Sequence, residues 1–146
     1  MLGVLGGVLL GVCIGGPAAP AHAQGCMPAE AAKLLASDGA AFDVFGGSVS
    51  ISGDTAVIGA YLDDDNGVDS GSAYVFTRSG SVWTQQAKLL PADGAASDQF
   101  GLSVSIDGDT AVIGAYADDD NGSASGSVYV FRWNGSSWVQ EQKLLH

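Results

Sequence analysis

The stretch FGGSVSISGDTAVIGA at residues 45–60 returns 55 residues later as FGLSVSIDGDTAVIGA at residues 100–115. The similarity extends beyond this stretch, because residues 33–87 and 88–142 align without a gap and are identical at 38 of 55 positions. An internal period near 50 residues is typical of propellers and solenoids, in which each repeat is one supersecondary unit. The duplication therefore indicates a repeat architecture before any single element is assigned.

Each repeat contains four segments that favour β-strands. Residues 45–51 alternate bulky apolar residues with Gly and Ser, which predicts a strand with one bulky face and one small face. Residues 55–61 are apolar on both faces, as in a strand buried between layers. Residues 72–76 alternate again, and residues 83–89 are polar and mixed, which suits an exposed edge strand. Four sequential strands joined by tight turns predict a propeller blade, and the small faces would let neighbouring blades approach closely.

The expected fold class is therefore all-β, with two four-stranded antiparallel repeats that form propeller-type blades. The first repeat is assigned to residues 33–87 and the second to residues 88–142. A closed propeller needs about 4–8 blades, so two blades make an incomplete propeller.

The triplet Lys-Leu-Leu occurs at residues 33–35, 88–90 and 143–145, which is once more than the Phe-Gly motif. Residues 31–35 are therefore expected to form an outer strand without its own blade. Residues 143–146 are either the start of a third repeat or the end of a closing strand. Three arrangements stay open: a closing strand that pairs with a blade elsewhere, a piece of a longer protein, and a head-to-tail ring of copies.

Composition excludes several classes of function. The 146 residues include 16 acidic and 5 basic side chains, giving a formal net charge of −11. Phosphate backbones and anionic membrane surfaces need Lys and Arg, so neither nucleic acid nor such a membrane is an expected partner. The length suits one domain, and two Cys are too few for a disulfide framework.

The first residues have the character of a signal peptide. Residues 2–16 form an apolar run of 15 residues, and Ala21-His22-Ala23 has the small-x-small form of a cleavage site. The run is shorter than the roughly 20 residues of a membrane span, although a lone N-terminal anchor helix is the alternative. We predict a signal peptide at residues 1–23, a linker at residues 24–32, and a protein that is secreted to the extracellular space, the cell surface or the periplasm.

Two cysteines lie in this N-terminal region. Cleavage would remove Cys13 and leave Cys26 as the one thiol of the mature chain. In an export compartment Cys26 would be free or would form an intermolecular bridge, and we assign it no chemistry.

The motifs Phe-Gly-Gly-Ser-Val and Val-Ile-Gly-Ala of the first repeat, with their counterparts in the second, resemble FG-GAP repeats. These repeats are the blades of the integrin α-subunit propeller, and bacterial secreted FG-GAP-like proteins are the closer likeness. The resemblance covers about residues 33–146. It implies a β-propeller, an extracellular location, calcium in the blade loops, and binding of protein or matrix.

An acidic loop recurs in both repeats. Three consecutive carboxylates repel one another, and calcium relieves this repulsion because it accepts carboxylate, amide and carbonyl oxygens in a flexible loop. The family pattern has acids at alternating positions before the Gly, whereas the first such position here is Leu62 or Ala117. The alternative is a solvated acidic turn that keeps strand edges apart. The candidate calcium ligands are Asp63, Asp64, Asp65, Asn66, Asp118, Asp119, Asp120 and Asn121.

Other polar and aromatic residues are assigned to structure. The aspartates at residues 38, 43, 93 and 98 are expected to form turns and to accept backbone N–H groups. Trp83 and Trp138 are expected to pack within the blades. Trp133 aligns with Arg78, so it is expected to be the more exposed tryptophan.

Catalysis has little support in the sequence. The predicted mature chain contains one His, at position 146, and one Cys near its start, so a nucleophile with a neighbouring base is not available. The leading hypothesis is a non-enzymatic, calcium-stabilised binding or adhesion protein with an extracellular protein or glycan as partner. A polysaccharide-acting hydrolase that uses two carboxylates is the second hypothesis, and a structural repeat fragment without a ligand is the third.

Overall fold

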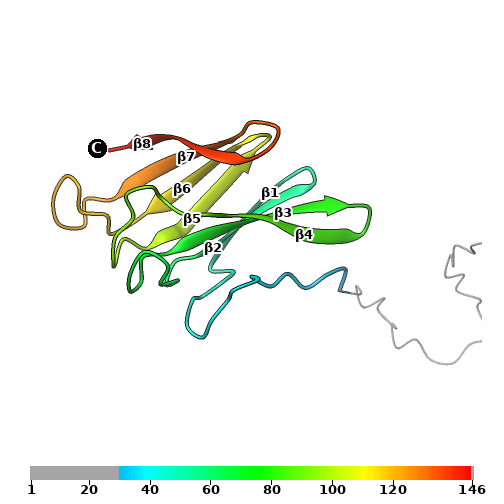
Figure 1. Ribbon diagram of the computed structural model, residues 1–146, viewed down its shortest axis with the longest axis horizontal. Helices are drawn as coiled ribbons and strands as arrows, with labels where there is room; N and C mark the ends of the chain where they lie inside the picture. Colours follow the sequence, from blue (N-terminus) through cyan, green and yellow to red (C-terminus); the bar gives the residue numbers. More distant parts are fainter. Residues whose placement is uncertain (1–29, 146) are drawn as a thin grey trace, which may run out of the picture.

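The computed structural model describes residues 30–145, which contain eight β-strands and no helix (Figure 1). The strands form two separate antiparallel sheets, in the spatial orders β1-β2-β3-β4 and β5-β6-β7-β8. The predicted all-β class with two four-stranded repeats is thus confirmed. The strands are β1 (Ser48–Ser52), β2 (Thr55–Ala60), β3 (Ser72–Ser79), β4 (Val82–Leu89), β5 (Phe100–Asp107), β6 (Thr110–Ala115), β7 (Ser127–Trp133) and β8 (Trp138–Leu144).

Several predictions concern residues outside the described part of the chain. These are the signal peptide at residues 1–23, most of the linker at residues 24–32, Cys13 and Cys26, and the terminal His146. Among residues 30–145, no helix has the length and apolar character needed to cross a membrane.

Each sheet is a meander in which neighbouring strands are also consecutive in sequence. The β1–β2 connection has two residues, and its first, Gly53, has a φ of 58°. A two-residue hairpin of type II′ requires a positive φ at this position, which glycine adopts without steric cost. The same turn recurs at Gly108, with a φ of 54°.

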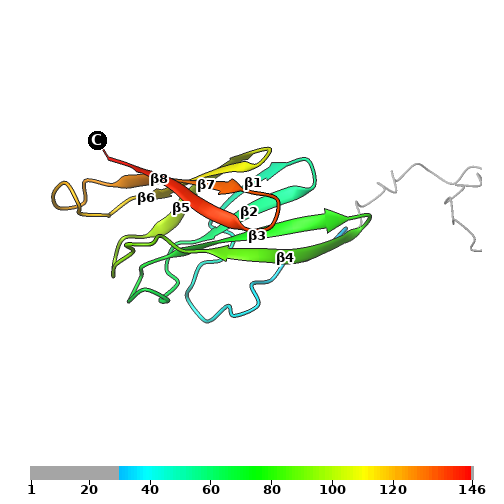
Figure 2. The ribbon, with the colours of Figure 1, turned by 45° about the horizontal axis from the view of Figure 1, so that its top comes forward.

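The two sheets stack face to face, with β5 lying against β1, β2 and β3 (Figure 2). We call the face of the first sheet that contacts the second sheet its following face, and the face of the second sheet that makes this contact its preceding face. The same two names are used for the equivalent faces of the other sheet. The following face of the first sheet and the preceding face of the second form one buried cluster. The first sheet contributes Val57, Ala73, Val75 and Leu89, and the second contributes Phe100, Ile106, Ala111, Ile113, Ala115, Tyr129 and Phe131.

Glycine permits the close backbone contact between the sheets. A Cβ atom on Gly59 would lie 1.9 Å from the Gly101 carbonyl oxygen, and one on Gly71 would lie 2.1 Å from the Phe100 oxygen. Gly71 also forms an isolated parallel bridge with Phe100. The small faces predicted from the sequence therefore do let the two blades approach closely.

Residues 31–35 do not form the outer strand that the sequence predicts. A strand needs a neighbour for its backbone hydrogen bonds, and within the described residues no strand pairs with this segment. Leu34 instead packs on the preceding face of the first sheet, against the cluster formed by Ile58, Ala60, Tyr74 and Phe76.

The strand that starts each repeat differs between the two copies. β5 begins at Phe100, whereas β1 begins at Ser48 and leaves Phe45 in the preceding turn. Phe100 pairs with Gly71 of the preceding blade, and Phe45 has no blade before it in the described chain.

All three tryptophans are half-buried. Trp83 and Trp138 are half-buried against the two apolar clusters, as expected. Trp133 is also half-buried, because its ring is tilted against that of Trp138 with 6.0 Å between the centroids. Trp133 is thus half-buried like the other two tryptophans, and it is not the exposed residue expected from the sequence.

Candidate functional site

A lysine surrounded by carboxylates lies at the same edge of each sheet. At the edge of the first sheet, Lys88 Nζ is 2.8 Å from Asp38 Oδ2, 3.0 Å from Asp63 Oδ2 and 2.6 Å from Asp65 Oδ2. We call this arrangement, together with Tyr74, the first lysine cage. It places one ammonium group among three carboxylates.

Strand register brings these groups together. Lys88, near the end of β4, is the cross-strand partner of Tyr74 on β3, and its ammonium lies 5.1 Å from the centroid of that ring. The Tyr74 hydroxyl oxygen is 2.8 Å from Asp63 Oδ2 and 2.9 Å from Asp38 Oδ1. Its single proton therefore serves one of the two carboxylates at a time.

The second sheet has the same arrangement at its edge, which we call the second lysine cage. Lys143 Nζ is 2.9 Å from Asp93 Oδ2 and 2.8 Å from Asp118 Oδ2, and it also contacts Asp120. The Tyr129 hydroxyl oxygen is 2.8 Å from Asp118 Oδ2 and 3.0 Å from Asp93 Oδ1.

Each cage ties three parts of the chain together. Asp63 and Asp65 belong to the β2–β3 loop, Lys88 to the outer strand, and Asp38 to the segment before β1. In the second repeat the corresponding segment is the connection between the two blades, which contributes Asp93. The cage thus fastens the loop and the incoming chain to one end of the sheet.

The first cage favours the ionised forms of Asp38 and Asp63. Burial raises the pKa of Asp63, but hydrogen bonds from Lys88 and Tyr74 outweigh it and bring this pKa below its ordinary value. The pKa of Asp38 is lowered chiefly by its hydrogen bond with Lys88. Burial also lowers the pKa of Lys88, yet its carboxylate partners raise that pKa well above the ordinary value.

The second cage shows the same balance. The pKa values of Asp93 and Asp118 are raised by burial but end below the ordinary value because Lys143 and Tyr129 bind the carboxylates. The pKa of Lys143 is correspondingly raised by Asp118 and Asp120 against the effect of burial.

The acidic loops are held in one conformation by their own side chains. Asp63 Oδ1 accepts a hydrogen bond from Asp65 N at 3.2 Å, and Asp64 Oδ1 accepts one from Asp69 N at 2.8 Å. The Ser70 hydroxyl bonds both Asn66 N and the Asp63 carbonyl oxygen. In the second loop, Asp118 and Ser125 make the corresponding bonds.

The structure divides the predicted calcium ligands into two groups. It brings Asp63 and Asp65 together around Lys88, and likewise Asp118 and Asp120 around Lys143. The remaining ones, Asp64, Asn66, Asp119 and Asn121, are exposed; the Asn66 side chain donates to the Pro91 carbonyl oxygen at 3.4 Å.

In residues 30–145, no group of three or more His, Cys, Asp or Glu side chains is arranged to hold a metal ion. Calcium in these loops therefore stays a prediction.

Sequence reasoning missed the lysines and the tyrosines of the cages. The signal was present, because Lys88 and Lys143 are two of only five basic residues and keep the spacing of the acidic loops. Asp38 and Asp93 were assigned to turns alone, whereas both carboxylates bind the lysine of their cage. The turn assignment holds for Asp43 and Asp98, whose Oδ2 atoms accept Ala40 N and Ala95 N at 2.6 and 2.7 Å.

The sequence of both blades matches a known repeat. The sequence model described as FG-GAP repeat matches residues 28–76 and 83–131. The chain belongs to the FG-GAP repeat family. Among curated proteins no match is found. The first match covers β1, β2 and most of β3, and the second runs from β4 to most of β7, so the second matched unit begins one strand before its sheet. Two matched repeats accompany two four-stranded antiparallel sheets, which are consistent with two propeller-type blades.

Proposed function

We propose that this FG-GAP repeat protein is a non-enzymatic binding module that works outside the cell. Its binding surface is the set of exposed carboxylates of the β2–β3 and β6–β7 loops, which we call the acidic rim. The rim consists of Asp64, Asp65, Asp119 and Asp120.

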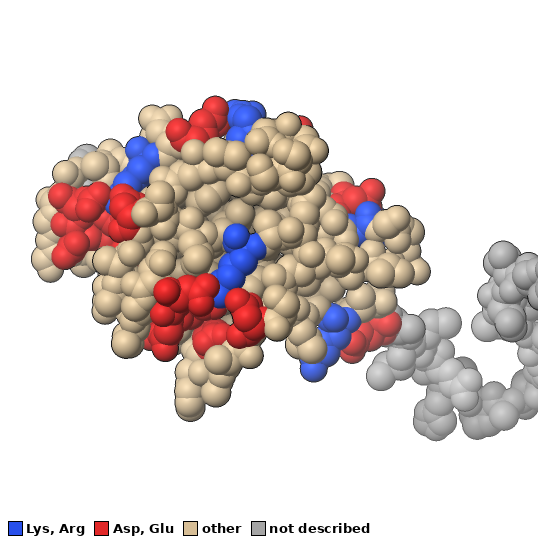
Figure 3. Space-filling view, in the orientation of Figure 1, with Lys and Arg blue, Asp and Glu red and all other residues tan. Residues whose placement is uncertain are grey.

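One observation carries this proposal: the rim is repeated and pre-organised. Figure 3 shows two larger groups of acidic side chains, each with a basic side chain beside it. Buried Asp63 and Asp118 bind the loop backbone and the cage lysine, and this fixes the neighbouring exposed carboxylates. A surface that is ordered before binding loses little conformational entropy when a partner docks.

The chemistry of the rim selects the class of partner. The formal net charge of −11 and the exposed carboxylates favour an extracellular protein that presents Lys or Arg side chains. The hydrolase hypothesis requires a carboxylic acid with a raised pKa, whereas the pKa values of Asp38, Asp63, Asp93 and Asp118 are lowered. Burial does raise the pKa of Asp98, but its carboxylate accepts the Ala95 N–H within the connection between the blades.

A binding experiment with a lysine-rich peptide tests the rim. We expect Asp119→Asn to weaken binding about 2–5-fold, because an exposed ion pair contributes up to about 1 kcal/mol. The matched control is Asp109→Asn, which removes the same charge from the β5–β6 turn at the other end of the sheet. Equal weakening by both substitutions would show a general charge effect and would overturn the assignment to the rim.

The extracellular location has its own test. Secretion through the predicted signal peptide would give a mature protein that begins at Gln24, which N-terminal sequencing of the protein from the culture medium would detect. Retention of the uncleaved chain in the cell would contradict this part of the proposal.

A further inference from the structure

Each of the two sheets has one face against the other sheet and one open face. Each open face carries the repeat counterparts of residues that are buried in the interface. Within the described chain, no blade covers the following face of the second sheet or the preceding face of the first. Val112 and Leu144 are 37% and 43% exposed, whereas their repeat counterparts Val57 and Leu89 are 0% and 3% exposed. On the other side, Ile51 is 61% exposed and its counterpart Ile106 is 7% exposed. The same apolar residues are thus buried where a blade lies against them and exposed where none does.

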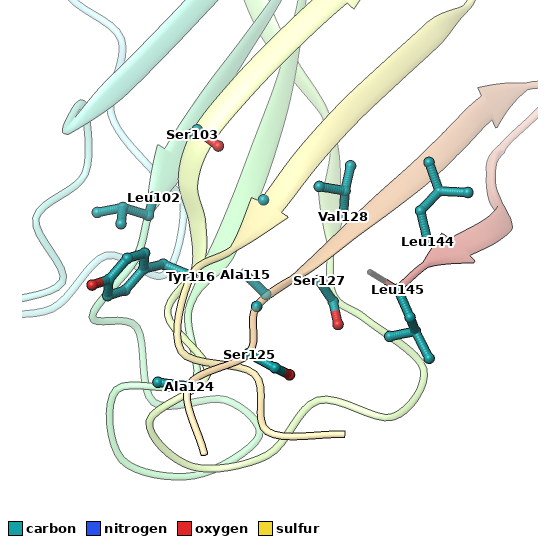
Figure 4. A pocket seen from close by; sticks show the side chains of 12 residues that line it. Leu102, Ser103, Ala115, Tyr116, Ala124, Ser125, Ser127, Val128, Leu144 and Leu145 are labelled. Carbon is teal, nitrogen blue, oxygen red and sulfur yellow. The ribbon is translucent and has the colours of Figure 1, made fainter. Parts of the chain in front are cut away.

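Both open faces form shallow apolar grooves. The groove on the following face of the second sheet has a volume of about 670 Å³ and is drawn in Figure 4. The groove on the preceding face of the first sheet has a volume of about 500 Å³. The first groove includes Leu102, Ser103, Val128 and Leu144, and the second includes Val49, Ile51, Ile58 and Trp83.

Serines of β1 specify how the two blades meet, because they bond the backbone of the second repeat. Ser48 Oγ donates to the Gly101 carbonyl oxygen at 2.7 Å, and Ser50 Oγ and Ser52 Oγ accept from Ile106 N and Gly108 N at 3.1 Å each. The counterparts of these serines on β5 are Ser103, Ser105 and Asp107, all exposed on the open following face. Ser103 has a hydroxyl that can donate as Ser48 does, and Ser105 and Asp107 have oxygens that can accept as Ser50 and Ser52 do, so the open face carries the same polar pattern.

Loop backbones provide a second set of contacts between the blades. Ser97 N, Gln99 N and Phe100 N donate to the carbonyl oxygens of Val68, Asp69 and Ser70 at 2.8, 3.2 and 3.0 Å. The corresponding donors of the first repeat are Phe42, Val44 and Phe45, and the corresponding acceptors of the second are Ser123, Ala124 and Ser125.

The donor loop of the first repeat already has the conformation that this contact requires. Phe42 and Ser97 have φ values of 78° and 71°, and Val44 and Gln99 have φ values of 55° and 56°. The Phe42 side chain is 88% exposed, which is unusual for a large apolar residue. Its positive φ is also rare for a residue other than glycine. The loop is therefore pre-formed for a neighbouring blade.

We propose that the following face of the second sheet binds the preceding face of the first sheet of a second copy of this chain. The contact is head to tail, and it repeats the interface between the chain's own two blades. Such contacts close into a ring if the rotation permits, and a ring of about 4–8 blades would contain two to four copies. This inference does not depend on the acidic rim.

The segment before β1 competes with this contact. Leu34 packs on the preceding face of the first sheet, in the position that Leu89 takes on the second sheet. In a head-to-tail contact, Leu144 of one copy would take this position on the next, so Leu34 must leave it. Replacing Leu34 with serine should therefore strengthen self-association.

Two variants of the full chain, each blocked on one face, test the proposal by sedimentation velocity. The following-face variant carries Val112→Lys and Leu144→Lys, and the preceding-face variant carries Val49→Lys and Ile51→Lys. All four side chains are exposed, so circular dichroism should show an unchanged fold. The control, Ser81→Lys with Ser136→Lys, adds the same charge at the hairpin tips, and the apolar segment at residues 2–16 is common to every variant.

We expect the unmodified chain and the control to associate as concentration rises through the micromolar range. Each face variant alone should be monomeric, and their equimolar mixture should form dimers but nothing larger, because each variant retains one intact face. Leu34→Ser should associate at lower concentration than the unmodified chain. A monomeric unmodified chain, face variants that still associate, or a mixture that stays monomeric would each overturn the proposal.

Discussion

The two repeats are nearly the same sequence in two different surroundings. Their lysine cages are alike, since Lys88 and Lys143 each contact three carboxylates and lie over a tyrosine ring. Their faces are not alike, since Val57 and Leu89 are buried whereas Val112 and Leu144 are partly exposed. A cage is built from one sheet, its acidic loop and the segment that leads into it, while the burial of a face requires another blade. The comparison separates what a repeat does alone from what it does only beside a neighbour.

The largest expected difference in stability is between substitution of a glycine at the blade interface and substitution of its counterpart on the open face. Gly59→Val should destabilise the protein by at least about 4 kcal/mol, because its Cβ would meet the Gly101 backbone at 1.9 Å. A Cβ on the counterpart Gly114 meets only the Ser103 hydroxyl closely, at 2.4 Å, and that side chain can rotate away. Urea denaturation of the two variants measures the contrast, and equal losses would show that the interface does not need this close approach.

Removal of the cage lysine should lower the free energy of unfolding by a similar amount in the two cages. Lys88→Met and Lys143→Met each leave carboxylates unpaired, one of them buried, and breaking such a pair costs about 3 kcal/mol or somewhat more. Urea denaturation should give similar losses for both variants. Arginine at either position keeps the charge, so Lys88→Arg is the matched control and should lose much less. A loss confined to one variant would contradict the view that each cage is independent of the neighbouring blade.

Truncation of the terminal leucines should distinguish the covered face from the open one. Leu89→Ala removes a buried side chain and should cost about 2–3 kcal/mol, whereas Leu144→Ala should cost less than about 1 kcal/mol. Thermal unfolding at low protein concentration, where copies do not associate, gives the intrinsic values. Equal costs there would mean that the open face is covered in solution by another part of the chain.

Acid should weaken both repeats in the same pH range. The pKa values of Asp38, Asp63, Asp93 and Asp118 are lowered in the folded protein, so their stabilising contribution is complete above the ordinary aspartate pKa of about 3.9. This contribution is lost as pH falls through the lower folded values. Unfolding followed from pH 7 to pH 2 should therefore show stability falling below about pH 4.

Asp98 and the two cage lysines also contribute to the pH dependence of stability. Burial raises the pKa of Asp98, so its protonation acts in the opposite direction and offsets part of the loss. The lysines, whose pKa values are raised, contribute until pH exceeds the ordinary lysine pKa of about 10.4 and lose their effect as pH rises through the folded values. Stability that increases on acidification from pH 5 to pH 3 would contradict the cage geometry.

The smallest expected effect concerns calcium. Lys88 already supplies a positive charge to Asp38, Asp63 and Asp65, so calcium has to compete with it for these carboxylates. Calcium at a concentration on the order of 10⁻³ M should raise the unfolding temperature of Lys88→Met more than that of the unmodified chain, judged against samples with chelator. A larger rise in the unmodified chain would mean that calcium binds the loop without displacing the lysine.

Much of the fold was predictable because it rests on short-range patterns. Alternation in residues 45–51, the turn at Gly53 and the polar edge strand each specify local structure, and the repeat doubles every signal. The cages were not predictable from the acidic loops alone. They join Asp38, Asp63 and Lys88, which are separated by 25 residues or more and are brought together by the β3–β4 register.

The sequence by itself determined that there are two repeats, that each folds as a four-stranded sheet, and that the molecule is strongly acidic. Periodicity is a pattern along the chain and net charge is a sum over residues, so neither depends on how the chain packs. Only the tertiary structure decided which apolar faces are buried, which aspartates are held by lysine, and where Leu34 lies. Both burial and ion pairing join residues that are distant in the sequence, so neither is specified by a local pattern. Burial depends in addition on a neighbouring blade, which is why Val57 and Val112 differ although the two lysine cages are alike.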